Sequence, residues 1–208
     1  MQSLAGKLLR GASTPIGRLR RSRPAGDGSW AAAADGIGSW SQRFIIRSMS
    51  ITIRPAQHQD RAPARELARC VLLEFDLEAD FDGIDCAIGR LGDPQRLNLI
   101  ECVCEVDGQF AGCLAIHALD ASSAKLAGFY IDSRFRGHGL GRAMLVDALT
   151  QARRLSIEFL HLQTMKSMTA AVHLYQTLGW QHVADLDPAS GVDTAFVLKL
   201  SHQGDKLL

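Results

Sequence analysis

The 208-residue sequence has little of what several broad classes of protein require. Its net charge is only +1, so composition gives no reason to expect nucleic acid as a partner. No apolar run approaches the roughly 20 residues that cross a bilayer, which argues against a membrane protein. The five cysteines form neither a CxxC pair nor an even disulfide set, and no second Cys or His pair completes a metal site. These absences predict a cytoplasmic protein with buried thiols and no metal.

The first 48 residues differ from the rest, because they are rich in Ala, Gly, Ser and Arg and show no sustained periodicity. Disorder is the default prediction for such a segment. Its Arg-rich, acid-poor start is also similar to a mitochondrial presequence. A third interpretation puts the true start at Met49, where Met-Ser-Ile-Thr-Ile-Arg-Pro opens a strand directly. We expect an extension over 1–48, one domain over 49–201 and a short tail over 202–208.

Three alternating glycines, Gly137, Gly139 and Gly141, stand between a predicted strand and a predicted helix. The strand is the apolar run 126–131, and apolar residues recurring every three to four positions predict the helix over 140–155. Such a turn offers free backbone N–H groups and the positive end of a helix dipole to an anion. Three arginines add positive charge at the same place: Arg134, Arg136 and Arg142. The segment therefore predicts a pyrophosphate-binding loop.

Two common phosphate loops do not fit this segment. A P-loop would end in Lys followed by Ser or Thr, whereas Arg142-Ala143 follows the last glycine here. A dinucleotide fingerprint would space its glycines as GxGxxG near the start of a βαβ unit, whereas these alternate as GxGxG late in the chain. A glycine-rich turn that merely connects a strand to a helix remains the alternative.

A second motif follows in the next predicted helix, where Ala171-x-x-Leu174-Tyr175-x-x-x-Gly179-Trp180 matches A-x-x-L-Y-x-x-x-G-F/W. The glycine turn, read from Arg136 to Gly141, matches R/Q-x-x-G-x-G/A. In this order and spacing, the two motifs resemble those of the GNAT superfamily of acetyl-CoA-dependent N-acetyltransferases. The resemblance covers roughly residues 51–200.

The resemblance implies an α+β fold with a mixed, mostly antiparallel central sheet flanked by helices. In that fold the fourth and fifth strands splay apart and hold the cofactor between them. The residue patterns predict a compatible order of elements, with no internal repeat. Strands are expected at 51–54, 97–105, 109–117, 125–131, 159–164, 181–185 and 194–200, and helices at 59–78, 84–91, 140–155 and 167–178.

The resemblance also implies how acetyl-CoA binds. The backbone of Phe129, Tyr130 and Ile131 would pair with the pantetheine amides as an added strand does. The side chains of Phe129 and Ile131 are also suited to packing in the core. The loop expected to hold the pyrophosphate consists of Arg136, Gly137, His138, Gly139, Leu140, Gly141 and Arg142. Family members often carry an asparagine where this chain has Met168. Ser167 or Thr164 could supply that polar contact, and Ser167 is also expected to cap the helix.

The chemistry implied is direct attack of a primary amine, on a small molecule or a peptide, at the thioester carbonyl. Tyr175 corresponds to the family's general acid for the leaving thiolate, and core packing is the alternative role for this side chain. The general base stays open, because Lys125 and Gln163 occupy the neighbourhood in which many members carry a glutamate. The candidates are His117, Glu101, His161 and Glu74.

Two alternatives remain at the level of function. The chain could be a non-catalytic acyl-CoA binding or sensing module that keeps the loop without turnover, or a nucleotide-binding regulator that uses the glycine turn. An acidic segment could attract a cationic amine acceptor, or could be a solvated helix and loop. Its acids are Glu74, Asp76, Glu78, Asp80, Asp82 and Asp85. A homodimer is compatible with the family, and the sequence does not decide it.

Overall fold

The computed structural model describes residues 41–46, 49–95, 98–183 and 192–200. Their strands form one eight-stranded sheet in the order β1-β2-β3-β4-β5-β6-β8-β7, with every neighbouring pair antiparallel except β5 and β6. The predicted α+β class with a mixed, mostly antiparallel sheet is thus confirmed. The strands are β1 (Gln42–Ile46), β2 (Met49–Pro55), β3 (Ile100–Val106), β4 (Gln109–Ala118), β5 (Ser123–Ile131), β6 (Phe159–Thr164), β7 (Gln181–Val183) and β8 (Thr194–Lys199).

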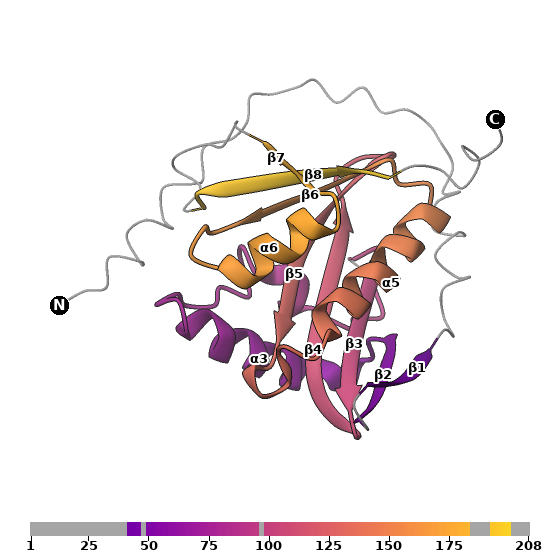
Figure 1. Cartoon of the computed structure of the whole chain (residues 1–208), viewed down its shortest axis with the longest axis vertical. Coiled ribbons are helices and arrows are strands. Elements are labelled where there is room, and N and C mark those ends of the chain that lie inside the picture. The colour runs from indigo at the N-terminus through magenta and orange to yellow at the C-terminus, as the bar shows by residue number, and fades with distance from the viewer. Residues whose placement is uncertain (1–40, 47–48, 96–97, 184–191, 201–208) are drawn as a thin grey trace.

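Helices cover both faces of this sheet. The α-helices are α3 (Arg61–Leu73), α4 (Cys86–Gly89), α5 (Leu140–Arg154) and α6 (Thr169–Thr177), and short 3₁₀ turns are η3 (His58–Asp60) and η4 (Ser133–Phe135). Figure 1 shows α5 and α6 on one side, with β6 and β8 running across the direction of β3, β4 and β5. No helix of the described residues is long and apolar enough to cross a membrane.

Alternation along the strands divides the core into two layers, since successive side chains point to opposite faces. Cys102 and Cys104 lie in the layer under α5 and α6, as their spacing predicts, whereas Val103 lies in the layer under α3 and α4. All five cysteines are free, and burial raises the pKa of the Cys104 thiol to about 12. The strand thiols are therefore packing groups rather than nucleophiles.

Two irregularities of the central strands create the site. The register of β4 and β5 shifts between Ala115 and Ile116, which leaves Ala127 without a partner in a β-bulge. The parallel pairing of β5 with β6 then stops after Lys125 and His161. Beyond that point, β5 continues to Ile131 and β6 to Thr164 without further pairing to each other. The fourth and fifth of the predicted strands, at 125–131 and 159–164, correspond to β5 and β6. The splay predicted between them is therefore confirmed.

Several predicted boundaries differ from the structure. Residues 42–46 form β1, so regular structure begins within the extension predicted to be disordered and earlier than Met49. The helix predicted over 59–78 ends at Leu73, because acids four positions apart repel and negative charge is unfavourable at a helix C-terminus. The helix predicted over 84–91 is a single turn. The remainder of the extension, residues 184 and 185 of a predicted strand, and the tail over 202–208 lie outside the described residues.

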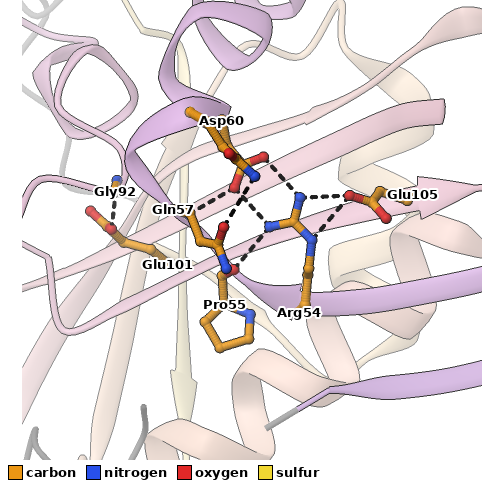
Figure 2. A network of polar contacts seen from close by, with 8 residues as sticks. Arg54, Pro55, Gln57, Asp60, Gly92, Glu101 and Glu105 are labelled. Carbon is orange, nitrogen blue, oxygen red and sulfur yellow. Dashed lines mark hydrogen bonds and ion pairs between the residues drawn. The ribbon is translucent and has the colours of Figure 1, made fainter. Parts of the chain in front are cut away.

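An ion-paired network fastens the first helix to the sheet (Figure 2). The Arg54 guanidinium donates to both oxygens of Asp60, at 2.7 and 2.9 Å, and to Glu105 on the neighbouring strand. The Asp60 carboxylate also accepts from the backbone N–H of Gln57 at 2.7 Å. Hydrogen bonding to Asp60 raises the pKa of Arg54. The network joins β2, β3 and the start of α3.

Candidate active site

A cavity of about 220 Å³ occupies the splay between β5 and β6. Its walls come from the segment between α3 and α4, from the bulged part of β4 and β5, from β6 and from α6. Polar residues in its lining include His117, Lys125, Gln163 and Tyr175. The edge of β5 that faces the cavity has no strand partner in the described residues after Lys125. An extended ligand could therefore add to this edge as a strand does.

The glycine turn follows directly from this open edge. Gly137 and Gly139 have φ values of 77° and 82°, a left-handed conformation that favours glycine. Six consecutive backbone N–H groups, from residue 137 to residue 142, find no acceptor in the described part of the chain. They lead into the first turn of α5, where free N–H groups and the helix dipole favour an anion. The turn thus has the geometry of the predicted pyrophosphate loop.

At Gly141 the absence of a side chain serves packing, whereas at Gly137 and Gly139 it permits a positive φ. A Cβ atom there would lie 3.3 Å from both the Leu174 and the Phe129 side chains. This glycine lets α5 approach α6 and β5 closely, which the sequence analysis did not foresee. Phe129 and Ile131 pack against the core on this face, so their side chains serve packing while their main chain lines the splay.

Two of the three arginines of the turn are held by protein groups. The Arg136 guanidinium bonds both carboxylate oxygens of Glu74, at 2.5 and 3.0 Å, and donates to the Ile131 carbonyl oxygen at 2.9 Å. Arg134 pairs with Asp132 at 2.7 Å. Arg136 therefore fixes the turn against α3, and the backbone rather than this side chain is free to receive a ligand.

Tyr175 lies in α6 with its ring in the core and only 5% of its surface exposed. The ring packs against Trp180 and Phe196 at centroid distances of 5.7 and 6.2 Å. Burial raises the pKa of Tyr175, so the hydroxyl stays protonated at neutral pH. Within the described residues the hydroxyl makes no hydrogen bond, and the side chain lines the cavity. Core packing and a proton-donor role are both compatible with this position.

The structure separates the four candidates for the general base. Glu74 is engaged by Arg136. Glu101 accepts from the Gly92 N–H at 2.9 Å (Figure 2) and also from the Asn98 side chain. Neither of these acids nor His161 lines the cavity, whereas His117 does. Burial lowers the pKa of His117, and the positive charge of Lys125 lowers it further. A neutral imidazole in the cavity is suited to accept a proton.

Three of the six acids of the acidic segment, Glu74, Asp80 and Asp85, are engaged by other groups of the protein. The Asp85 carboxylate accepts from the Tyr130 hydroxyl and from the Asp80 N–H, both at 2.9 Å, and burial raises the pKa of Asp85. Asp80 in turn accepts from the N–H groups of Asp82 and Gly83. Only Glu78 and Asp85 of the segment line the cavity. No group of three or more His, Cys, Asp or Glu side chains in the described residues is placed to hold a metal.

The prediction that Ser167 caps the last helix is wrong. α6 begins at Thr169, Met168 occupies the capping position, and no side chain caps the helix. Ser167 is exposed and does not line the cavity. Met168 does line it and contacts the Thr164 hydroxyl, whose oxygen lies 3.4 Å from the sulfur atom. An apolar thioether thus stands where related proteins often have a polar amide.

The sequence analysis assigned no role to the side chains of two site residues. Lys125 reaches the cavity from the last paired position of β5, and Tyr130 turns its hydroxyl away from α5 to Asp85. His117 lies opposite Lys125, one position from the Ala118–Ala124 pair next to the connection between β4 and β5. Strand alternation could have assigned Tyr130 and Phe129 to opposite faces.

Comparisons with known proteins agree with this geometry. The family model described as the acetyltransferase (GNAT) family matches residues 62–180. The chain is 27% identical over 145 residues to an uncharacterized N-acetyltransferase, YjgM, of Escherichia coli (strain K12), covering 66% of this chain and 86% of that protein.

Two solved structures share the fold. An acetyltransferase of the GNAT family from Staphylococcus aureus Mu50 has a TM-score of 0.63 at 16% identity, covering 73% of this chain and 99% of that one. The putative acetyltransferase yncA from Salmonella typhimurium, solved with its cofactor acetyl-CoA, has a TM-score of 0.58 at 20% identity over 74% and 96% of the two chains. The motifs, the splayed sheet and the family match together establish that this chain belongs to the GNAT family of acetyltransferases, enzymes that carry out acetyl-CoA-dependent acetylation.

Proposed function

We propose that this enzyme transfers the acetyl group of acetyl-CoA to the primary amine of a small molecule or peptide by direct attack. The observation that carries the proposal is the continuity of three features. The cavity with His117 and Tyr175 opens onto the unpaired edge of β5, and that edge leads into the glycine turn. A donor with a reactive end, an amide-bearing arm and a pyrophosphate matches these features in order.

The residues present fit such a donor. The free edge beside Phe129, Tyr130 and Ile131 can pair with amides of an extended arm. The six free N–H groups from Gly137 to Arg142 can receive the pyrophosphate. Acetyl-CoA supplies the acetyl group as a thioester, whose carbonyl carbon is the electrophile.

His117 and Tyr175 complete the proton balance. His117 accepts the proton that the amine gives up as its nitrogen bonds to the acetyl carbon. Tyr175 donates the proton that the departing sulfur gains, and the hydroxyl is protonated at neutral pH because burial raises its pKa. The products are an amide and a thiol, and proton transfer through solvent from His117 to Tyr175 restores both groups.

The test begins with calorimetric titration of the full chain with acetyl-CoA and with acetyl-pantetheine, which lacks the pyrophosphate. We expect acetyl-CoA to bind at least tenfold more tightly, because only it engages the turn. Varying the ligand avoids placing a side chain at Gly139, where positive φ would strain the turn itself. Equal affinities would remove the pyrophosphate role, and no binding of either would overturn the proposed function.

A further inference from the structure

Lys125 is an unusual member of the cavity wall. Its ammonium group donates to the Gln163 side-chain oxygen at 2.8 Å and makes no ion pair within the described residues. Burial lowers the pKa of Lys125, which reflects the cost of holding this charge away from water. An ammonium group has three donors, so two remain for a ligand. A half-buried cation without a carboxylate partner is suited to bind an anionic group.

Lys125 is also placed beside the proposed base. Lys125 and His117 are directly opposite each other across β4 and β5, so their side chains leave the sheet on the same face. Both line the cavity at the closed end of the splay. A molecule that binds Lys125 through an anion therefore brings its neighbouring atoms next to the His117 imidazole.

The other charged groups of the cavity do not compete for this role. Asp85 is engaged by Tyr130 and by backbone N–H, and Glu78 is exposed on the segment that follows α3. That side of the cavity is mainly apolar, with Leu72, Leu77 and Ile84 in its wall. The cavity thus offers a cation next to a base at one end and an apolar surface at the other.

We propose that the acceptor is a free α-amino acid, whose carboxylate binds Lys125 while its α-amine faces His117 and its side chain packs on Leu72, Leu77 and Ile84. In an α-amino acid the amine and the carboxylate share one carbon, which matches a base and a cation on directly opposite residues. A peptide N-terminus has no carboxylate on that carbon and leaves Lys125 unpaired. The inference rests on the proposed acetyl transfer and narrows its acceptor.

The experiment compares the twenty common amino acids with their α-carboxamides, using acetyl-CoA and measuring release of free coenzyme thiol. Losing the carboxylate lowers the amine pKa, so an amide presents more neutral amine and is the better acceptor where the carboxylate is not recognised. We expect the best free amino acid to exceed its amide roughly ten- to hundred-fold in kcat/KM, as for a charge-assisted hydrogen bond. An amide that matches or exceeds every free amino acid would overturn the inference.

Variants at Lys125 assign the preference to this side chain. Lys125→Met should raise the KM for the best amino acid by roughly ten-fold or more and remove its advantage over the amide. Lys125→Arg should keep much of that advantage. Lys166→Met removes the same charge from a nearby lysine that does not line the cavity, and should change nothing. A loss of kcat shared equally by acid and amide in Lys125→Met would assign Lys125 to catalysis and overturn recognition.

Binding of acetyl-CoA keeps the two proposals distinguishable. Its Kd should change less than about twofold in Lys125→Met, since the affected group lies at the acceptor end. Tight acetyl-CoA binding together with acetylation of amides alone would defeat the acceptor proposal and leave acetyl transfer standing. Absence of acetyl-CoA binding would defeat both proposals.

Discussion

Arg136 and Glu74 are 62 positions apart in sequence and form a two-point ion pair, with nitrogen–oxygen distances of 2.5 and 3.0 Å. Glu74 directly follows the last residue of α3, and Arg136 lies at the entry of the glycine turn. The Arg136 side chain also donates to the carbonyl oxygen of Ile131, the last residue of β5. One guanidinium therefore holds the turn against both the sheet and the first helix.

Breaking this ion pair should weaken the binding of acetyl-CoA, the acetyl donor, and should not affect the amine acceptor. Glu74→Gln should weaken acetyl-CoA binding by up to about fivefold, since a partly exposed ion pair contributes at most about 1 kcal/mol. The acceptor KM should not change, because Glu74 does not line the cavity. Asp76→Asn is the matched control, and asparagine tolerates the positive φ found there. A raised acceptor KM in Glu74→Gln alone would instead support the attraction of a cationic acceptor.

The chain has only two tyrosines, and each is a control for the other. Tyr175→Phe keeps the ring that packs on Trp180 and Phe196 and removes the proposed proton donor. We expect kcat to fall by roughly a hundredfold or more while the Kd for acetyl-CoA changes little. Steady-state kinetics and calorimetry check the two quantities, and an unchanged kcat would reduce Tyr175 to a packing residue.

Tyr130→Phe should lower the stability of the protein rather than its catalytic rate. It removes the only side-chain donor that Asp85 has among the described residues, at a buried site. The free energy of unfolding should drop by about 1–3 kcal/mol, as for a buried acceptor left short of a partner. Urea denaturation measures this loss, and kcat should fall far less than in Tyr175→Phe. A stability equal to that of the parent would show that Asp85 finds another partner.

The titration of His117 should determine the acidic limb of the pH profile of kcat, that is, how kcat falls toward low pH. The base acts when neutral, and burial together with Lys125 lowers the pKa of His117 below its ordinary value of 6.5. The kcat should therefore fall toward low pH with an apparent pKa below 6.5, and Lys125→Met should move this limb to higher pH. His117→Gln should lower kcat by roughly 10²- to 10⁴-fold. His161→Gln changes a histidine that lies two strands away, in β6, and outside the cavity wall, so it should leave the profile unchanged.

The strand before Met49 should contribute measurable stability. β1 pairs with β2, and the Gln42 side chain donates to the buried Asp147 carboxylate of α5 at 2.7 Å. A chain starting at Met49 should lose about 1–3 kcal/mol of unfolding free energy relative to one starting at Ser41, because a buried acceptor loses a donor. Gln42→Ala in the longer chain isolates the hydrogen bond from the strand pairing. Identical urea midpoints for the two chains would show that β1 is dispensable.

Local patterns were sufficient for much of the fold. Apolar residues at helical spacing predicted α5, an apolar run predicted β5, and alternation predicted β6. The glycines predicted a turn between a strand and a helix. β1 was missed because the segment Gln42–Ile46 follows a long stretch without periodicity, and its pairing partner is what orders it. The end of α3 was missed because helix propensity alone does not register repulsion among successive acids.

The sequence by itself determined the family, the glycine turn and the position of Tyr175, because each depends on residues close together in the chain. Only the tertiary structure decided which of four candidate bases reaches the cavity and that Arg136 is engaged by Glu74. It also decided that Lys125, which has no ion-pair partner among the described residues, lies opposite His117. These relations join residues on different strands and helices. The β-bulge, the splay and the packing of helices on the sheet set them, and no local spacing encodes those features.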